Sequence, residues 1–186
     1  MIISKDEFTN RQSKFFKELA AGAVFIYPTD TVYGIGCDAA NTAAVQRIRE
    51  IKDRAVMPFS VIAPSIKWIR DHCIVKDETW LSKLPGPYTL IFPAKDFECI
   101  SHDVAMGRGS LGVRIPDHWI SEVIAAYGKP IVTTSANVTG GNVMQAIEDL
   151  PAQLRHVDFI IYEGPRHGNA STLIDLTEPK PKIIAR

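Results

Sequence analysis

The regular alternation of short apolar segments with amphipathic ones is the feature that most constrains the fold of this chain. Short runs rich in Val, Ile, Phe and Tyr are predicted to be strands, and segments with helical periodicity lie between them. The predicted strands cover 23–27, 59–63, 88–92, 111–115, 131–134, 159–162, 172–176 and 183–185, and helical stretches fall near 66–73, 78–84, 119–127 and 144–154. This pattern predicts an α/β fold with a mixed sheet flanked by helices.

Near the N-terminus, one further helix has a recognisable start signal. Ser4 and Glu7 match a capping box, in which each side chain satisfies a backbone donor of the other residue. The helix that follows is anchored by three apolar residues with helical spacing, Phe8, Phe15 and Leu19.

Another helix begins at Asn41 or Thr42, either of which can serve as its N-cap. Its inward residues are predicted to be Val45, Ile48 and Ile51, and its outward residues Arg47, Arg49 and Glu50. Lys52 and Arg54 follow where this helix should end. Cations are favoured there by the helix dipole alone. Because Pro58 stops the helix before the next strand, two cations at this corner could also meet an anion.

The bulk composition excludes several classes of protein. Lys plus Arg and Asp plus Glu both number 21, so the formal net charge is zero, unlike that of proteins dedicated to nucleic acids. No apolar run approaches the ~20 residues of a membrane span, and no signal-peptide pattern is present. Three cysteines without a CxxC pair fit neither a disulfide framework nor a zinc ribbon. We therefore expect one domain over residues 1–186, located in the cytoplasm.

One motif matches by letter only. Gly107, Gly109 and Gly112 fit the G-x-G-x-x-G pattern, but they precede a predicted strand instead of opening a helix, as dinucleotide binding requires. No G-x-x-x-x-G-K-[ST] sequence is present, and the five histidines show no metal-ligand spacing. Any ATP must therefore bind without a Walker loop, and no metal site is predicted.

The segment from 28 to 36 leaves a predicted strand and concentrates hydroxyl groups and glycines. Thr29, Thr31 and Tyr33 alternate, so in an extended chain they share one face, and glycines let a backbone approach a ligand closely. Such a segment suits recognition of a small polar molecule. A turn built on hydroxyl-to-backbone hydrogen bonds explains the same residues.

Polar residues also stand beside later strands. Ser135 and Asn137 follow the apolar strand 131–134, and open α/β sheets bind ligands at the carboxyl ends of strands. These residues could donate to a phosphate or ribose oxygen, and turn formation explains them equally well. Ser171 opens a late strand, and Thr89 follows a rigid Pro-Gly-Pro turn.

Taken in order, these segments resemble the YrdC/Sua5 family. The shared strings are PTDTVYGIGCD, a helix ending in KDR, LPGPYTLIF, GVRIP, TTSAN and STLIDL, and they extend over 27–175. The family's basic pair and Ser-x-Asn element fall on Lys52, Arg54, Ser135 and Asn137. The resemblance implies a twisted mixed sheet with a concave cleft.

The resemblance also implies an activity. A member of this family is expected to condense L-threonine, bicarbonate and ATP, with Mg²⁺ on the ATP phosphates, to threonylcarbamoyl-AMP and pyrophosphate. A downstream transferase would carry the product to tRNA as N6-threonylcarbamoyladenosine, so tRNA binding by this chain should be weak or indirect, and no membrane is involved. The implied residues are Lys52 and Arg54 as catalytic cations, Thr29, Thr31 and Tyr33 at the threonine end, and Thr89, Arg114, Ser135, Asn137 and Ser171 as ATP or carbamate contacts.

Two departures from the family pattern accompany the match. Met57 stands where the family often has a polar or basic residue, and the chain ends at Arg186, where relatives usually continue, so the short form is expected. The alternatives are a YciO-like member with another adenylation substrate, the related domain of hydrogenase-maturation carbamoyltransferases, and an RNA-binding or ribosome-associated module. The TTSAN string disfavours the first, the absence of zinc-finger parts the second, and the balanced charge the third.

Overall fold

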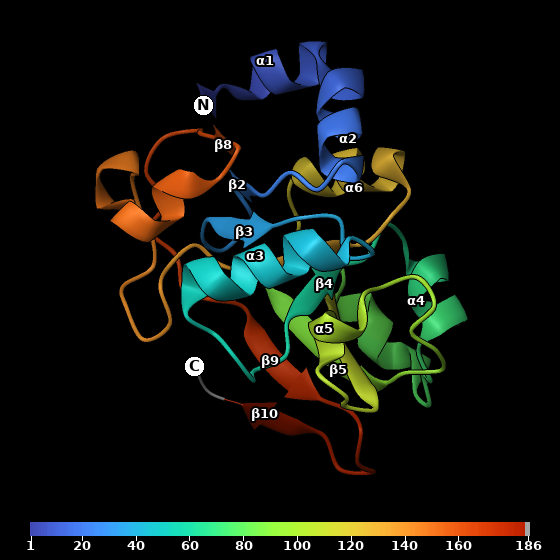
Figure 1. Cartoon of the computed structure of the whole chain (residues 1–186). Coiled ribbons are helices and arrows are strands. Elements are labelled where there is room, and N and C mark those ends of the chain that lie inside the picture. Colours follow the sequence, from blue (N-terminus) through green and yellow to red (C-terminus); the bar gives the residue numbers. More distant parts are fainter. Residues whose placement is uncertain (185–186) are drawn as a thin grey trace.

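A mixed, twisted sheet forms the centre of the computed structural model, which describes residues 1–184 (Figure 1). The strands are β1 (Ile2–Ile3), β2 (Phe25–Tyr27), β3 (Gly34–Gly36), β4 (Ser60–Ile62), β5 (Tyr88–Pro93), β6 (Ser110–Arg114), β7 (Ile131–Ser135), β8 (Phe159–Ile161), β9 (Thr172–Asp175) and β10 (Lys182–Ile184). Their order is β1-β8-β2-β3-β7-β4-β6-β5-β9-β10. Because β4 pairs in parallel with β6 and antiparallel with β7, the predicted mixed α/β sheet is confirmed.

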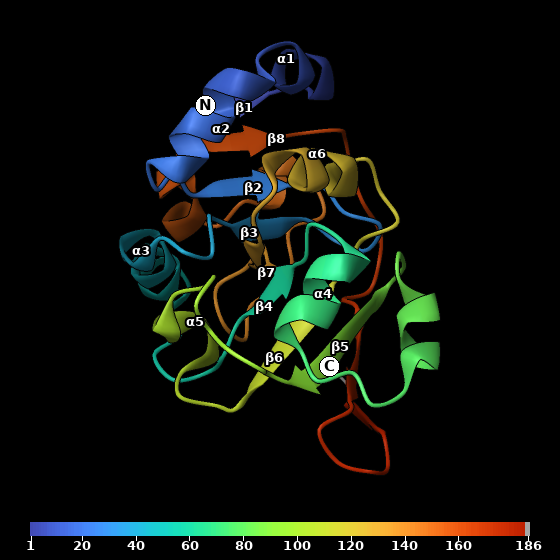
Figure 2. The ribbon, with the colours of Figure 1, turned by 90° about the vertical axis from the view of Figure 1, so that its right-hand side faces the viewer.

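Helices flank this sheet, as predicted. The α-helices are α1 (Lys5–Asn10), α2 (Gln12–Ala20), α3 (Thr42–Lys52), α4 (Ile66–His72), α5 (His102–Ala105) and α6 (Ile120–Tyr127), and the 3-10 helices are η1 (Glu78–Lys83), η2 (Ile147–Asp149) and η3 (Ala152–His156). Figure 2 shows α3 and α5 beside one face of the sheet and α6 near the N-terminal helices. None of the helices within residues 1–184 has the length and apolarity needed to cross a bilayer.

The N-terminal capping box is confirmed, but the predicted helix is two helices. Ser4 Oγ accepts from the Glu7 amide at 3.1 Å, and the Glu7 carboxylate accepts from the Ser4 amide at 2.8 Å. Arg11 leaves the helical region with φ −120° and ψ 23°, which separates α1 from α2. The change of direction lets Phe8 and Phe15 stack at 4.9 Å between ring centroids, and both are buried.

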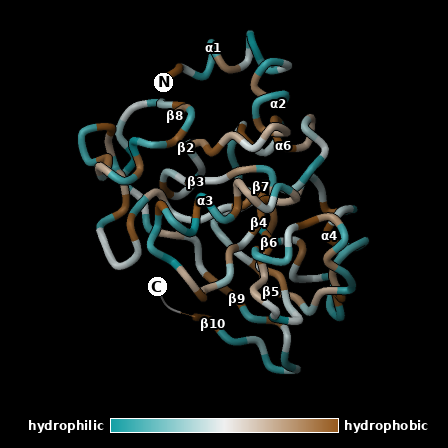
Figure 3. The backbone as a smooth tube through the Cα atoms, viewed as in Figure 1, coloured by the Kyte–Doolittle hydropathy of each residue, from teal (hydrophilic) through white to brown (hydrophobic). Residues whose placement is uncertain are grey.

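The core consists of two clusters on opposite faces of the sheet. Val61 and Val132 point into the larger cluster, which is covered by α3, α4 and α5. Their neighbours Ile62 and Ile131 point into the smaller cluster, which is covered by α1, α2 and α6. Alternate strand residues point to opposite faces, so each central strand supplies both clusters. Figure 3 shows the hydrophobic residues concentrated along these central strands.

Two further local predictions were wrong in detail. The predicted helix 144–154 is the pair η2 and η3, because Pro151 lacks an amide donor and Asp149 accepts from the backbone amides of Gln145 and Ala146. The segment from 28 to 36, where no strand was predicted, contains β3, which pairs with β2 and β7. Only glycine fits at Gly36, since a Cβ there would lie 2.0 Å from the Val132 carbonyl oxygen.

The other boundaries agree to within a few residues. Segment 78–84 is the 3-10 helix η1 instead of an α-helix, and Asn41 is the N-cap of α3. Gly107 and Gly109 precede β6, which confirms that they do not open a helix. The last predicted strand corresponds to β10, while Ala185 and Arg186 lie outside the described residues.

Candidate functional site

One face of the sheet changes from apolar to polar along β4 and β7. Ile62 and Ile131 lie opposite each other at the border of the smaller core cluster. Ser60 and Thr133, each two positions from these isoleucines on the same strands, also lie opposite each other. Since alternate residues of a strand share a face, this polar pair continues the surface that is apolar under α6. The switch creates a polar floor beside the smaller cluster.

A narrow pocket opens on this floor, and a larger cavity adjoins it. The narrow pocket of about 20 Å³ is lined by Thr29, Val32, Gly34, Ser60, Thr89, Arg114, Thr133, Thr134, Ser135, Ala170 and Ser171. The large cavity of about 1010 Å³ includes Thr134, Ser135, Ala170 and Ser171 in its lining, together with Arg54, Asn137 and Asn169. We call the two together the cleft. Most of the predicted site residues therefore meet at one place, although they come from distant parts of the chain.

Three of the predicted residues are not among the side chains that line the cleft. Tyr33 is fully buried, and its hydroxyl donates to the Gly164 carbonyl at 2.7 Å and accepts from the Glu163 amide at 3.0 Å. Burial raises the pKa of Tyr33, so the phenol stays neutral. Thr31 lies beside the cleft, with its hydroxyl 3.4 Å from the Arg114 guanidinium. The third residue is Lys52.

Lys52 lies behind the loop that carries Ser135 and Asn137. Its side chain is 1% exposed, and Nζ donates to the Ser135 carbonyl at 2.6 Å, the Asn137 carbonyl at 2.6 Å and the Asn137 Oδ1 at 3.0 Å. The Thr139 hydroxyl in turn donates to the Lys52 carbonyl at 2.8 Å. These contacts fix the shape of the loop. A direct catalytic role for the ammonium stays a prediction.

Arg114 places a buried positive charge on the floor of the narrow pocket. It is 6% exposed, and Nη2 lies 2.5 Å from a carboxylate oxygen of Asp30. The second oxygen of Asp30 accepts from the Asp117 amide at 3.0 Å. Burial lowers the pKa of Arg114 and Asp30 opposes that effect, so the guanidinium stays charged. Its Nε has no acceptor within residues 1–184.

Arg54 lines the large cavity, and Arg49, which was not predicted as a site residue, donates to the Arg54 carbonyl and holds it there. Arg54 donates to the Pro58 carbonyl at 2.9 Å and lies over the Phe59 ring. Arg49 was predicted to face solvent but is buried, donating to the carbonyls of Arg54 and Met57 at 2.9 Å each. The prediction was wrong because periodicity describes α3 alone, whereas the turn after it leaves carbonyls that only a buried donor can satisfy.

The loop 163–171 closes the other side of the cleft. Arg166 donates to the Thr29 carbonyl at 2.9 Å and to the Glu163 carboxylate at 2.7 Å. Gly168 approaches the opposite segment so closely that a Cβ there would lie 2.1 Å from the Thr31 carbonyl oxygen. Nothing in the sequence pattern singled out these residues, because their partners are far away in the chain. They hold Thr29 in place against the narrow pocket.

His118 is part of the same network and is expected to make stability depend on pH. Its Nε2 lies 2.9 Å from Arg166 Nη2 and 3.2 Å from a Glu163 oxygen. Burial, and next the Arg166 cation, lower the pKa of His118 below its ordinary value of 6.5. The unfolded chain therefore takes up the proton first. The stability due to neutral His118 is complete above about pH 6.5 and is lost as the pH falls below it.

A His118→Gln variant tests this expectation. Urea unfolding measured from pH 7 to pH 5.5 should show a smaller loss of stability in the variant than in the wild type. Glu163 does not interfere, because its hydrogen bonds from Arg166 and Trp119 outweigh burial and hold its pKa below 4.5. The exposed His156→Gln variant is the control and should keep the wild-type pH dependence. Equal dependence in His118→Gln would contradict the assignment.

Comparisons with known proteins identify the family of the chain. The Sua5/YciO/YrdC family model, described as "Telomere recombination", matches residues 17–186. A protein of Vibrio campbellii named threonylcarbamoyl-AMP synthase is 37% identical over 164 residues, which cover 82% of this chain and 85% of that protein. A protein of the same name from Bos taurus is 31% identical over 173 residues, covering 87% of this chain and 62% of its own length.

Solved structures show the same architecture. The structure of P. abyssi Sua5 complexed with L-threonine matches with a TM-score of 0.84 and 28% identity, over 98% of this chain and 56% of that one. The present chain thus corresponds to little more than half of that protein. E. coli YciO matches with a TM-score of 0.79 at 24% identity, over 92% of this chain and 86% of that one, which is a likeness of fold alone.

Proposed function

The chain belongs to the Sua5/YciO/YrdC family, and on that premise we propose that it is an L-threonylcarbamoyladenylate synthase, a nucleotidyltransferase. It condenses L-threonine, bicarbonate and ATP to threonylcarbamoyl-AMP and pyrophosphate. The similar proteins named threonylcarbamoyl-AMP synthase support this proposal, as does the P. abyssi Sua5 complex with L-threonine. A downstream transferase would use the product to modify tRNA in the cytoplasm.

The observation that carries the proposal is the pair of arginines facing one cleft. Arg114 lies at the floor of the narrow pocket, and Arg54 lines the large cavity that joins it. Threonine carboxylate, bicarbonate and ATP are all anions, so bringing them together requires positive charge on more than one side. The large cavity is at the upper end of the usual size for a small-molecule site, which suits a nucleotide.

The reaction can be written with the residues in place. The threonine amine adds to the carbon of bicarbonate and water leaves, which gives a carbamate. A carbamate oxygen then attacks the α-phosphorus of ATP, and pyrophosphate leaves. Arg114 and Arg54 neutralise charge on the carboxylate and the phosphates, which is where preorganised cations contribute most to rate. Mg²⁺ enters with the ATP phosphates, and we propose no protein ligand for it.

Hydroxyl groups provide the remaining contacts in this proposal. Thr29 faces the narrow pocket at the threonine end. Thr31 holds it in position, since the two hydroxyls lie 3.0 Å apart, and Tyr33 anchors the same segment through its hydrogen bonds with Glu163 and Gly164. Thr89 and Ser171 line the pocket, and their hydroxyls lie 2.7 Å apart. Ser135 and Asn137, whose side chains are 2.7 Å apart, would contact ATP from the loop held by Lys52.

Substrate dependence tests the proposed function. Pyrophosphate release from ATP and Mg²⁺ should require threonine and bicarbonate together, because neither alone forms the attacking carbamate. Mass spectrometry should then identify threonylcarbamoyl-AMP as the product. Reactions that lack one substrate, or that contain serine in place of threonine, are the controls. Equal release with ATP alone would contradict the proposal, and tight tRNA binding without any adenylate would favour the RNA-binding alternative.

A further inference from the structure

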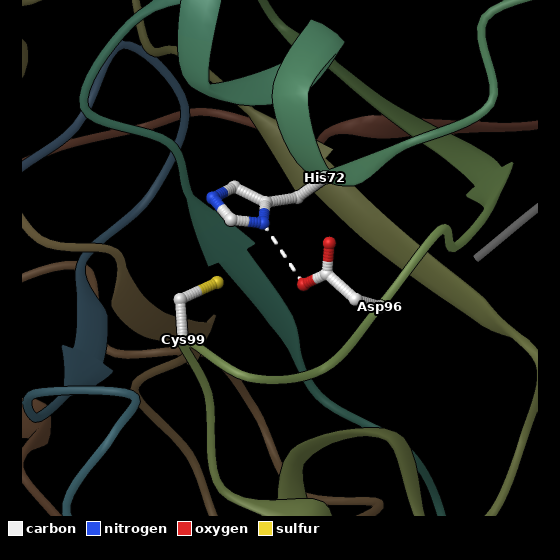
Figure 4. A group of neighbouring side chains, drawn as sticks. All are labelled: His72, Asp96 and Cys99. Atoms are coloured by element: carbon white, nitrogen blue, oxygen red, sulfur yellow. Dashed lines mark hydrogen bonds and ion pairs between the residues drawn. The ribbon is translucent and has the colours of Figure 1, made fainter.

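A group of three potential metal ligands lies away from the cleft. His72 is the last residue of α4, and Asp96 and Cys99 lie in the loop after β5. Figure 4 shows the three side chains directed toward a common space. One donor atom from each lies within 4.8 Å of the others, and all three residues are partly buried. Cys99 packs against the larger core cluster, and none of the three residues lines the cleft.

The backbone around this group is fixed by hydrogen bonds. The Lys95 amide donates to the His72 carbonyl at 2.8 Å, and the Ile74 amide donates to the Pro93 carbonyl at 2.8 Å. These two bonds join the end of α4 to the chain that leads into Asp96. The His72 ring also packs against the Trp68 ring, with 4.8 Å between centroids. The first two ligands are therefore positioned before any ion arrives.

The distances fit a tetrahedral ion. His72 Nδ1 and Asp96 Oδ1 are 3.0 Å apart and share a hydrogen bond. Bond lengths to Zn²⁺ of about 2.0–2.3 Å place neighbouring tetrahedral ligands roughly 3.3–3.6 Å apart. An ion can therefore replace the shared proton with a small separation of the two groups. The Cys99 sulfur needs to approach by roughly 1.5 Å at most, since the whole group already lies within 4.8 Å.

The donor types decide which class of ion fits. Thiolate and imidazole ligands favour zinc and its chemical relatives over Mg²⁺ or Ca²⁺, which prefer oxygen ligands. One carboxylate and one thiolate balance the two positive charges of such an ion, and the imidazole binds in its neutral form. We propose that His72, Asp96 and Cys99 bind one zinc-class divalent cation, with water as the fourth ligand. The ion ties the C-terminal end of α4 to the loop after β5.

The spacing of these residues along the chain could not reveal this site. Asp96 and Cys99 are three positions apart, which alone is a common arrangement in a turn. His72 precedes Asp96 by 24 residues and reaches it only because β5 returns the chain beside α4. The site is also separate from the reaction proposed above, since its residues do not line the cleft.

A cobalt titration of the chelator-treated full chain tests the proposal without any substrate. Co²⁺ should bind with one-to-one stoichiometry and give both a thiolate charge-transfer band and the intense visible bands of tetrahedral cobalt. Added Zn²⁺ should then remove these bands. Each of Cys99→Ser, His72→Gln and Asp96→Asn should weaken binding by at least roughly tenfold to a hundredfold, which is the usual effect of losing even a residue that only supports a ligand. Cys99→Ser should also abolish the charge-transfer band.

Two control variants, His156→Gln on the surface and Cys37→Ala in the core, should keep wild-type binding and spectra. Circular dichroism of every variant establishes that it is folded. Thermal melts give a second measurement, because Zn²⁺ should raise the melting temperature of the wild type but not that of the three ligand variants. Cobalt binding without a thiolate band, or with equal affinity in the ligand variants, would overturn the site. Neither result bears on the synthase assay.

Discussion

The Arg54→Ala variant is expected to remain folded and to turn over roughly a hundredfold more slowly than the wild type, which is the usual effect of losing one preorganised charge contact in the transition state. Arg54 lines the large cavity, so its loss removes positive charge from the place where ATP is proposed to bind. The turn should stay folded in the variant, because the buried Arg49 still donates to the Met57 carbonyl and lies over the Phe59 ring. The measurement is the rate of threonylcarbamoyl-AMP formation per folded molecule.

The Arg54→Lys variant sharpens this test. A lysine keeps the charge but loses the planar fork that can hold two oxygens at once, so this variant should also be clearly impaired. The exposed Arg155→Ala change is the matched control, because it removes the same charge elsewhere, and it should leave turnover unchanged. If Arg54 is only a surface residue at the end of α3, both Arg54 variants should show wild-type turnover, and the proposed electrostatic role would be wrong.

Lys52→Met is expected to have the second large effect, on stability as well as on turnover. The change leaves the Ser135 and Asn137 carbonyls and the Asn137 side chain without the ammonium that now donates to all three. Losing charged hydrogen bonds to buried acceptors should cost roughly 3 kcal/mol of unfolding free energy. Because the loop lines the cleft, turnover should fall as well. Urea unfolding and the synthase assay measure the two effects.

Measuring stability and turnover separately distinguishes a role of Lys52 in holding the loop from a role in the reaction. Lys67 is an exposed lysine that pairs with Asp71 on the surface of α4, and Lys67→Met should leave stability and turnover nearly unchanged. If Lys52→Met retains full stability, the contacts that we describe for Nζ do not hold the loop. If it loses stability but keeps turnover per folded molecule, Lys52 has no part in the reaction, and the family-based prediction of a catalytic cation would be wrong.

Local features were predictable from the sequence because they depend on residues a few positions apart. The Ser4–Glu7 capping box joins residues three apart, and the Asn41 cap of α3 satisfies the amide of Ala44 in the same way. The apolar strands could be placed because alternation of apolar and polar residues, or a short apolar run, indicates which side chains of a strand are buried. The ordered strings from 27 to 175 identified the family and with it the fold, and most of the site residues that they predicted line the cleft.

The tertiary structure alone decided which partner each polar side chain meets. Lys52 reaches Ser135, 83 residues away, and Arg114 reaches Asp30, 84 residues away, because the strand order brings their elements together. The same holds for His72 and Asp96. The sequence shows only that a charged side chain is able to donate or to act as a ligand. Burial makes a partner necessary, because a polar group removed from water must find a hydrogen-bond partner nearby. Periodicity therefore located the helices and strands, whereas long-range packing determined that Lys52 holds a loop, Arg49 faces inward and Arg114 faces the cleft.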